Sequence, residues 1–148
     1  MRTGLALTSL AGLLAGACGG GTAPATLDTR AGVACASCRM TVSDVRTASQ
    51  IVAAGEEPLF FDDLGCLREY RSTHPRASGA RVFVADHHTG AWVPAGDAVY
   101  ARAGGVETPM GSHLLAWASA AARDADPASR GAEPQDAAAL FGPQGETR

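Results

Sequence analysis

The sequence contains no lysine, and its charge balance gives no reason to expect a nucleic-acid partner. All twelve basic residues are arginines, fifteen residues are acidic, and the formal net charge is −3. A nucleic-acid-binding protein usually carries a basic surface that neutralises phosphates. The composition therefore argues against such a function.

Residue patterns typical of an enzyme active site are also missing. The sequence shows no Ser-His-Asp arrangement and no phosphate-binding loop. Asp62 and Asp63 are adjacent, and neighbouring side chains diverge, so one of them is better explained as a helix N-cap than as half of a catalytic pair. We therefore predict that the protein is not an enzyme.

The N-terminal apolar run is too short to remain as a transmembrane helix. Arg2 precedes apolar residues 5–17, whereas a membrane-spanning helix needs about 20 residues. This layout is typical of a secretory signal peptide, and the small residues that lead into Cys18 resemble a bacterial lipoprotein signal. We predict a signal peptide over residues 1–17 and lipidation of Cys18, whose acyl chains would anchor the protein to a lipid membrane. The residue after the lipidated cysteine is Gly19 and not Asp, which favours the outer membrane over the inner membrane. We therefore expect the protein at the periplasmic face of the cell envelope.

Composition divides the remainder of the chain into three parts. Residues 18–30 begin with a Gly-rich stretch and are predicted to form a flexible tether. Residues 31–125 are enough for one small domain. Residues 126–148 are rich in Pro, Ala and polar residues, and we predict a disordered tail.

Periodicity within the domain predicts an α+β fold. We expect extended segments at 41–43, 48–53 and 59–61, then a helix that Asp62 or Asp63 caps and that ends near Ser72. Further strands are expected at 81–86, 91–94, 98–102 and 106–108, followed by a helix from Thr108 or Ser112 to about Arg123. Strand, strand, helix thus occurs twice, which indicates two ββα-type halves whose helix N-termini could face one another.

Sulfur-containing residues form the one pattern that suggests chemistry. With Cys18 lipidated, Cys35, Cys38 and Cys66 remain, an odd number for an exported protein. Met40 lies two residues after Cys38, so both can face one point. Cys66 is expected in the first turn of a helix, where the macrodipole lowers a thiol pKa.

Two further residues extend this candidate ligand set. Met110 and His113 are three apart, on one face if both are helical. Copper(I) accepts Cys, Met and His, whereas zinc is hardly ever bound by Met. The set therefore favours a copper(I) site. Two alternatives remain open: a thiol–disulfide redox protein or sensor using Cys35 and Cys38, and an envelope scaffold that holds structural zinc.

The sequence resembles the NosL family of copper-binding lipoproteins. The resemblance runs in family order through Cys18 and residues 35–42, 48–51, 61–67, 84–86, 90–92, 98–100 and 108–111. One position departs from the family pattern: Arg39 stands where Gly is usual between the second cysteine and the methionine. A side chain suits positive φ poorly, so the turn before Met40 should be strained if the family geometry is kept.

This resemblance implies both a function and a fold. It implies copper(I) delivery to an extracytoplasmic copper enzyme, nitrous oxide reductase, although another such acceptor remains open. We further hypothesise that a membrane copper exporter is the donor. It also implies two halves that resemble the organomercurial lyase fold. Cys38, Met40 and Met110 are the leading ligands by this resemblance, followed by Cys35, Cys66 and His113.

Overall fold

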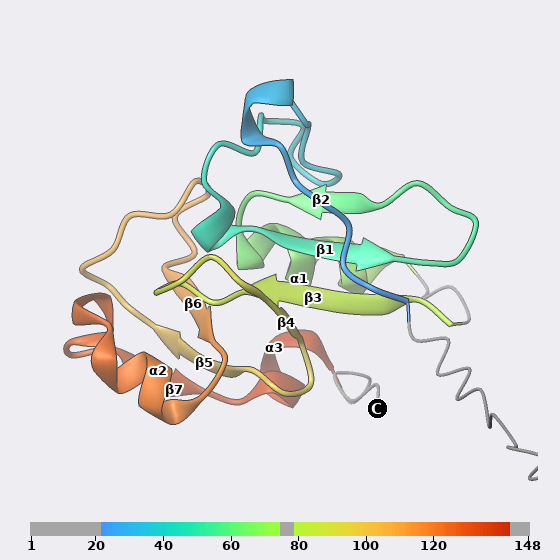
Figure 1. Ribbon diagram of the computed structural model, residues 1–148. Coiled ribbons are helices and arrows are strands. Elements are labelled where there is room, and N and C mark those ends of the chain that lie inside the picture. The colour runs from blue at the N-terminus through green and yellow to red at the C-terminus, as the bar shows by residue number, and fades with distance from the viewer. Residues whose placement is uncertain (1–21, 75–78, 143–148) are drawn as a thin grey trace, which may run out of the picture.

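In the described part of the chain, two antiparallel sheets and three short α-helices form an α+β domain (Figure 1). The computed structural model describes residues 22–74 and 79–142. The predicted signal peptide, Cys18 and Gly19 lie outside the described residues. Within the described part, no helix is long and apolar enough to cross a membrane.

The first sheet has four strands in the order β2-β1-β3-β4. These are β1 (Ser49–Val52), β2 (Leu59–Phe61), β3 (Arg81–Ala85) and β4 (Trp92–Pro94). Helix α1 (Leu64–Thr73) follows β2 directly, and the Asp63 carboxylate caps it by accepting the Gly65 N–H. The predicted β1–β2–α1 unit is confirmed, but the expected strand at 41–43 is reduced to an isolated bridge between Ala34 and Thr41.

The second sheet has the order β6-β5-β7 and corrects one expected helix. It contains β5 (Val99–Arg102), β6 (Leu114–Trp117) and β7 (Glu133–Gln135). The helix expected from Thr108 or Ser112 to Arg123 is wrong, because all four residues of β6 are buried and pair with β5. Ser119 then caps the shorter helix α2 (Ala120–Ala125), and residues 106–108 form a loop instead of a strand.

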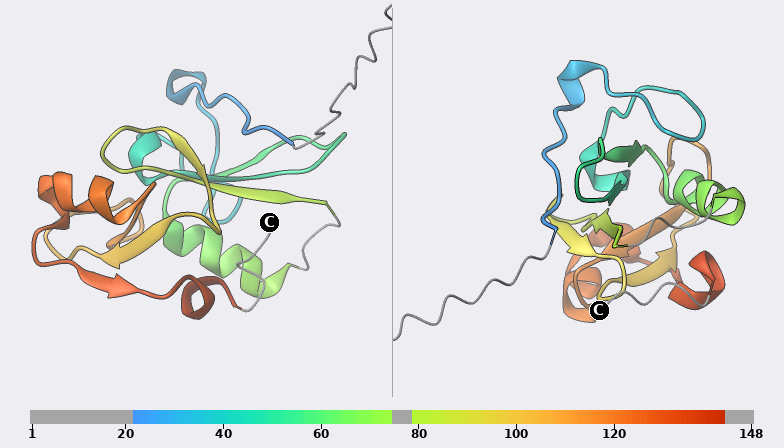
Figure 2. Two further views of the ribbon diagram at one scale, coloured as in Figure 1. Left: turned by 60° about the horizontal axis from the view of Figure 1, so that its bottom comes forward. Right: turned by 90° about the vertical axis from the view of Figure 1, so that its right-hand side faces the viewer.

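Strand, strand, helix therefore does occur twice, as β1-β2-α1 and β5-β6-α2. The second helix begins later than expected, so the two helix N-termini do not form the predicted pair. Instead, the loop between β5 and β6 extends from the second sheet to the start of α1 (Figures 1 and 2). This loop carries Met110.

Residues 126–142 are folded, which corrects the predicted disordered tail. They form η3 (Pro127–Ser129), β7 and α3 (Ala137–Phe141), and β7 pairs with the edge of β5. Leu140 and Phe141 are buried in the core, and the Phe141 ring contacts Tyr100 edge-on. The low apolar content of this segment led to the prediction of disorder. A few buried apolar residues and the N-caps Asp126 and Asp136 are enough to order it. Residues 143–148 lie outside the described part.

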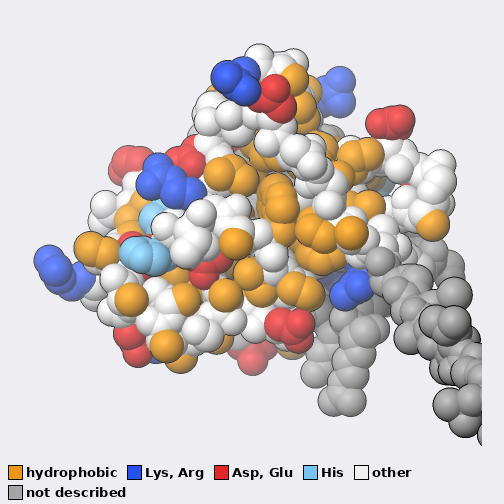
Figure 3. Space-filling view, viewed as in Figure 1, with side chains coloured by type: hydrophobic (Ala, Val, Ile, Leu, Met, Phe, Trp, Pro, Cys, Tyr) orange, Lys and Arg blue, Asp and Glu red, His pale blue; other side chains and the backbone are white. Residues whose placement is uncertain are grey.

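The end of the predicted tether is also ordered. Gln50, fully buried in β1, accepts the Ala25 backbone N–H and donates to the Ala25 carbonyl oxygen. Ala25 and Leu27 pack against the main core, and η1 (Thr29–Ala31) follows. On the face of the molecule seen in Figure 3, hydrophobic side chains gather over the first sheet, and charged groups lie mostly around the edge. The chain is thus fixed to the domain from Ala25 onward.

Candidate metal centre

A tight turn before the first sheet carries the C-x-x-C pair. The Cys35 N–H donates to the Met40 carbonyl oxygen and the Arg39 N–H to the Cys35 carbonyl oxygen, which closes the turn. The Ala36 N–H donates to the Phe60 carbonyl oxygen, so β2 holds the turn in place. Arg39 adopts φ +68°, the left-handed conformation that the family pattern predicted at this position.

Four side chains from this turn and the β2–α1 junction converge. The ligand atoms of Cys35, Cys38, Asp62 and Cys66 all lie within 4.8 Å of one another. No other such group of His, Cys, Asp or Glu occurs in the described part of the chain. We call these four residues the thiol cluster. The structure thus brings all three expected cysteines together.

Asp62 is the member that sequence reasoning missed. Its Oδ2 and Oδ1 atoms lie 3.4 and 3.5 Å from Cys38 Sγ, whose thiol donates to the carboxylate. Asp63 takes the capping role, so its neighbour Asp62 is free to point toward the turn. The divergence of adjacent side chains was the available signal: once one Asp caps the helix, the other points elsewhere.

Burial raises the pKa values of two of the three thiols. Cys35 and Cys66 are buried, whereas Cys38 is partly exposed. Burial raises the pKa of Cys38 above its ordinary value. Burial also raises the pKa of Cys66, and the neighbouring Cys35 and Asp62 add to the rise. The expectation that the helix dipole would lower the Cys66 pKa is wrong, because desolvation is the larger effect.

Both methionines beyond residue 21 lie at the surface. Met40 is 52% exposed and Met110 is 50% exposed, and they are the large hydrophobic residues found exposed in the described part. Core filling therefore does not explain either of them. Met110 is tied to the helix that carries Cys66, because its backbone N–H donates to Asp63 Oδ2 over 3.0 Å.

His113 lies in the same loop as Met110 but is outside the thiol cluster. Its Nδ1 atom lies 2.8 Å from the Val106 carbonyl oxygen. Because a carbonyl oxygen only accepts hydrogen bonds, Nδ1 carries the proton, and Nε2 is the ring nitrogen that could bind a metal. Its φ of +57° is unusual for a residue other than glycine. In the described part, the non-glycine residues with positive φ are Arg39, which precedes the exposed Met40, and His113, three residues after the exposed Met110.

The donor set fits a thiophilic cation. Three thiols and one carboxylate can surround a single ion, with the partly exposed Cys38 on the accessible side. Soft sulfur ligands suit copper(I), and a Cys and Asp set also suits zinc. The geometry therefore supports metal binding.

Comparison with known proteins relates the chain to a protein family. A family model described as NosL matches residues 25–131. No curated protein and no solved structure matches the chain, so the likeness to organomercurial lyase stays a prediction.

Proposed function

Because this chain belongs to the NosL family, we propose that it is a copper(I) carrier and not an enzyme. The observation that supports this most is the convergence of three thiols within 4.8 Å, two of them in a turn whose last residue, Met40, has an exposed thioether. Thiolate and thioether donors together favour copper(I) over harder ions. The proposed ligands are Cys38, Met40 and Met110, with Cys35, Cys66 and His113 as further donors.

The gradient of exposure suggests how cargo enters and leaves. Cys35 and Cys66 are buried, Cys38 is partly exposed, and Met40 and Met110 are half exposed. Copper(I) would first meet the exposed sulfurs and then the buried thiols. A partner's thioether or imidazole would remove it by the reverse ligand exchange.

The proposed setting is the bacterial cell envelope. A lipid anchor on Cys18 would hold the carrier at the periplasmic face, preferably of the outer membrane. Copper(I) would come from a membrane exporter and pass to nitrous oxide reductase or another extracytoplasmic copper enzyme. Ala25, seven residues after Cys18 in the sequence, is fixed to Gln50 of β1.

A competition experiment tests the carrier function. Reduced protein, loaded with one equivalent of copper(I) without oxygen, is titrated with a chromogenic copper(I) chelator. We expect Cys38→Ser to abolish retention, and Met40→Leu and Met110→Leu each to weaken it by roughly tenfold. Zinc retention in the two methionine variants is the matched control, because zinc hardly uses thioether ligands. Unchanged copper(I) retention in both methionine variants would contradict the proposal.

Structural zinc is the second candidate, and Asp62 is the observation that favours it. A set of three thiols and one carboxylate matches the donors that zinc accepts. Metal analysis of protein purified without oxygen separates the two functions, because one equivalent of zinc and no copper would favour the scaffold. A redox role of Cys35 and Cys38 receives less support, since burial raises the pKa of Cys38, the more exposed of the two thiols, and so disfavours its reactive thiolate.

A further inference from the structure

One buried carboxylate joins the start of α1 to the loop that carries Met110. Asp63 Oδ1 accepts the Gly65 N–H over 2.6 Å, which caps the helix. Its Oδ2 accepts the Thr108 hydroxyl over 2.6 Å and the Met110 N–H over 3.0 Å. Burial raises the Asp63 pKa, but hydrogen bonds from the hydroxyls of Ser112 and Thr108 and from two backbone N–H groups outweigh it and lower the pKa overall. The carboxylate is therefore charged at neutral pH.

The loop is built around the Thr108 side of this contact. The Thr108 hydroxyl donates to Asp63 and accepts the His113 N–H over 3.0 Å. The Gly111 N–H donates to the Thr108 carbonyl oxygen, which closes a turn around Met110. Both ends of the Met110 turn are thus held by one buried threonine.

The helix start and the loop are also in close contact. A Cβ placed on Gly65 would lie 2.9 Å from Ser112 Cβ, closer than such atoms approach. A side chain at position 65 would therefore push the loop away from the residues that precede Cys66. Gly65 permits this approach by its lack of a side chain.

These buried bonds hold the backbone of a residue whose side chain is exposed. Asp63 and Thr108 are buried, yet the residue they fix, Met110, is half exposed. A contact that served the core alone would not need to hold this turn. The same carboxylate caps the helix that carries Cys66 and directly follows Asp62 of the thiol cluster.

We propose that Asp63 and Thr108 are positioning residues that hold the Met110 turn against the start of α1, so that its thioether can join the thiol cluster in metal capture. This inference rests on the proposed copper(I) function. Neither residue contributes a ligand. Their effect on copper(I) retention therefore passes through Met110.

The test compares three threonine variants of the full protein. Thr108→Val removes the hydroxyl but keeps the shape, Thr108→Ser restores the hydroxyl, and Thr89→Val is the matched control. Thr89 makes the same kind of bond, from its hydroxyl to Asp86 over 2.9 Å, in the β3–β4 turn outside the thiol cluster. We expect Thr108→Val to weaken copper(I) retention by roughly tenfold, with wild-type retention in the other two variants.

A double-mutant cycle with Met110→Leu separates positioning from simple destabilisation. If Thr108 acts through Met110, Thr108→Val should cost almost nothing in the Met110→Leu background. Hydrogen exchange of the Met110 amide in metal-free protein should also speed up in Thr108→Val and stay slow in Thr89→Val. Gly65→Ala, whose Cβ would lie 2.9 Å from both Asp63 Oδ1 and Ser112 Cβ, disturbs the same contact from the helix side and should show the same dependence on Met110.

The outcomes distinguish the two hypotheses. Equal weakening by Thr108→Val with and without Met110 would overturn the positioning role and leave the carrier function intact. The same holds if Thr108→Val retains copper(I) like the wild type. If the wild-type protein fails to retain copper(I) against the chelator, both the carrier function and the metal-capture role are overturned.

Discussion

The Sγ atom of Cys38 lies 3.4 Å from Oδ2 of Asp62, which places an oxygen donor among the three thiols. Carboxylates suit zinc better than copper(I). Asp62→Asn should therefore lower zinc affinity by roughly tenfold and change copper(I) affinity much less. Chelator competition with each metal measures both effects.

The control for this variant is Asp97→Asn, which makes the same change at an exposed position. It should leave both affinities unaltered. If Asp62→Asn lowered copper(I) affinity as much as zinc affinity, Asp62 would have to be counted among the copper(I) ligands.

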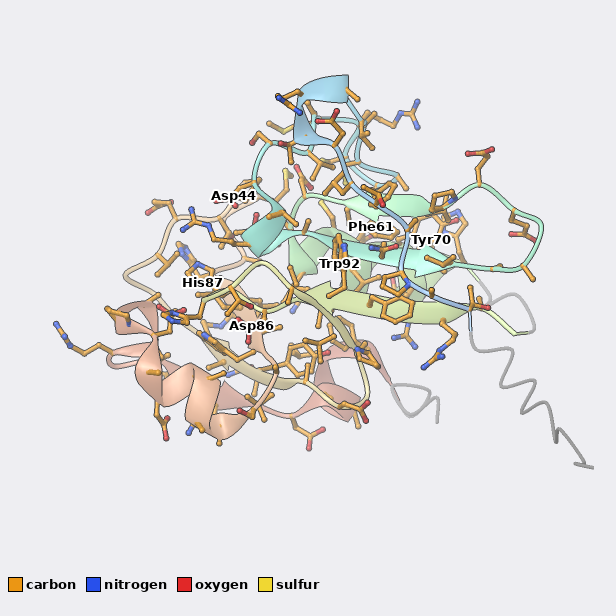
Figure 4. All side chains as sticks on the ribbon, viewed as in Figure 1. Asp44, Phe61, Tyr70, Asp86, His87 and Trp92 are labelled. Atoms are coloured by element: carbon orange, nitrogen blue, oxygen red, sulfur yellow. The ribbon has the colours of Figure 1, made fainter. Side chains whose placement is uncertain are left out.

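Asp126 makes the folded protein sensitive to acid. Burial raises the pKa of its carboxyl, but hydrogen bonds from His87 and from the Trp117 indole outweigh this and lower the pKa to about 2. Figure 4 shows His87 on the side of the molecule where α2 lies. Because the folded pKa is below the unfolded value of about 3.9, the stabilisation is complete above about pH 4 and is lost as the pH falls toward 2.

Asp126→Asn should remove this part of the pH dependence. We expect it to lower the free energy of unfolding by about 2 kcal/mol at neutral pH and to have a much smaller effect near pH 2. Urea unfolding followed by tryptophan fluorescence measures this. Asp124→Asn, two residues away and exposed, is the control. Equal losses at both pH values would show that the Asp126 charge contributes nothing.

Helix α3 should contribute measurably to stability, although its sequence looks like part of a tail. The Phe141 ring is buried, and its centroid lies 5.4 Å from that of Tyr100. Phe141→Ala should lower the free energy of unfolding by about 3 kcal/mol. Ala139→Ser changes an exposed residue of the same helix and should be nearly neutral. An unaltered unfolding midpoint in Phe141→Ala would mean that α3 is not docked in solution.

Local signals predicted the first half of the fold well. The β1–β2 hairpin, the Asp63 cap and the C-x-x-C turn each depend on neighbouring residues. The run Leu114–Trp117 fits a buried helix or a buried strand equally, and only its pairing with β5 decides for a strand. Local patterns do not report such tertiary contacts.

The candidate site was predictable to a similar extent. Residue chemistry identified the three cysteines that the structure brings together, whereas the ligand roles of Met40 and Met110 stay predictions. Asp62 joins the thiol cluster only through the path of β2 into α1, and its neighbour has the more usual capping role. The burial that raises the Cys66 pKa is likewise a property of the folded core.

Arg39 is strained, and relieving that strain should stabilise the protein without altering its metal site. Its φ of +68° costs a residue with a Cβ about 1 kcal/mol relative to glycine. Arg39→Gly should therefore raise the free energy of unfolding by about 1 kcal/mol, as measured by urea unfolding. Arg39→Ala removes the same exposed side chain but keeps the Cβ, so it should give no such gain. Copper(I) retention should match the wild type in both variants, because the hydrogen bonds that close this turn come from the backbone. Equal stabilisation by Ala and Gly would show that the side chain, and not the left-handed backbone, is the source of the strain.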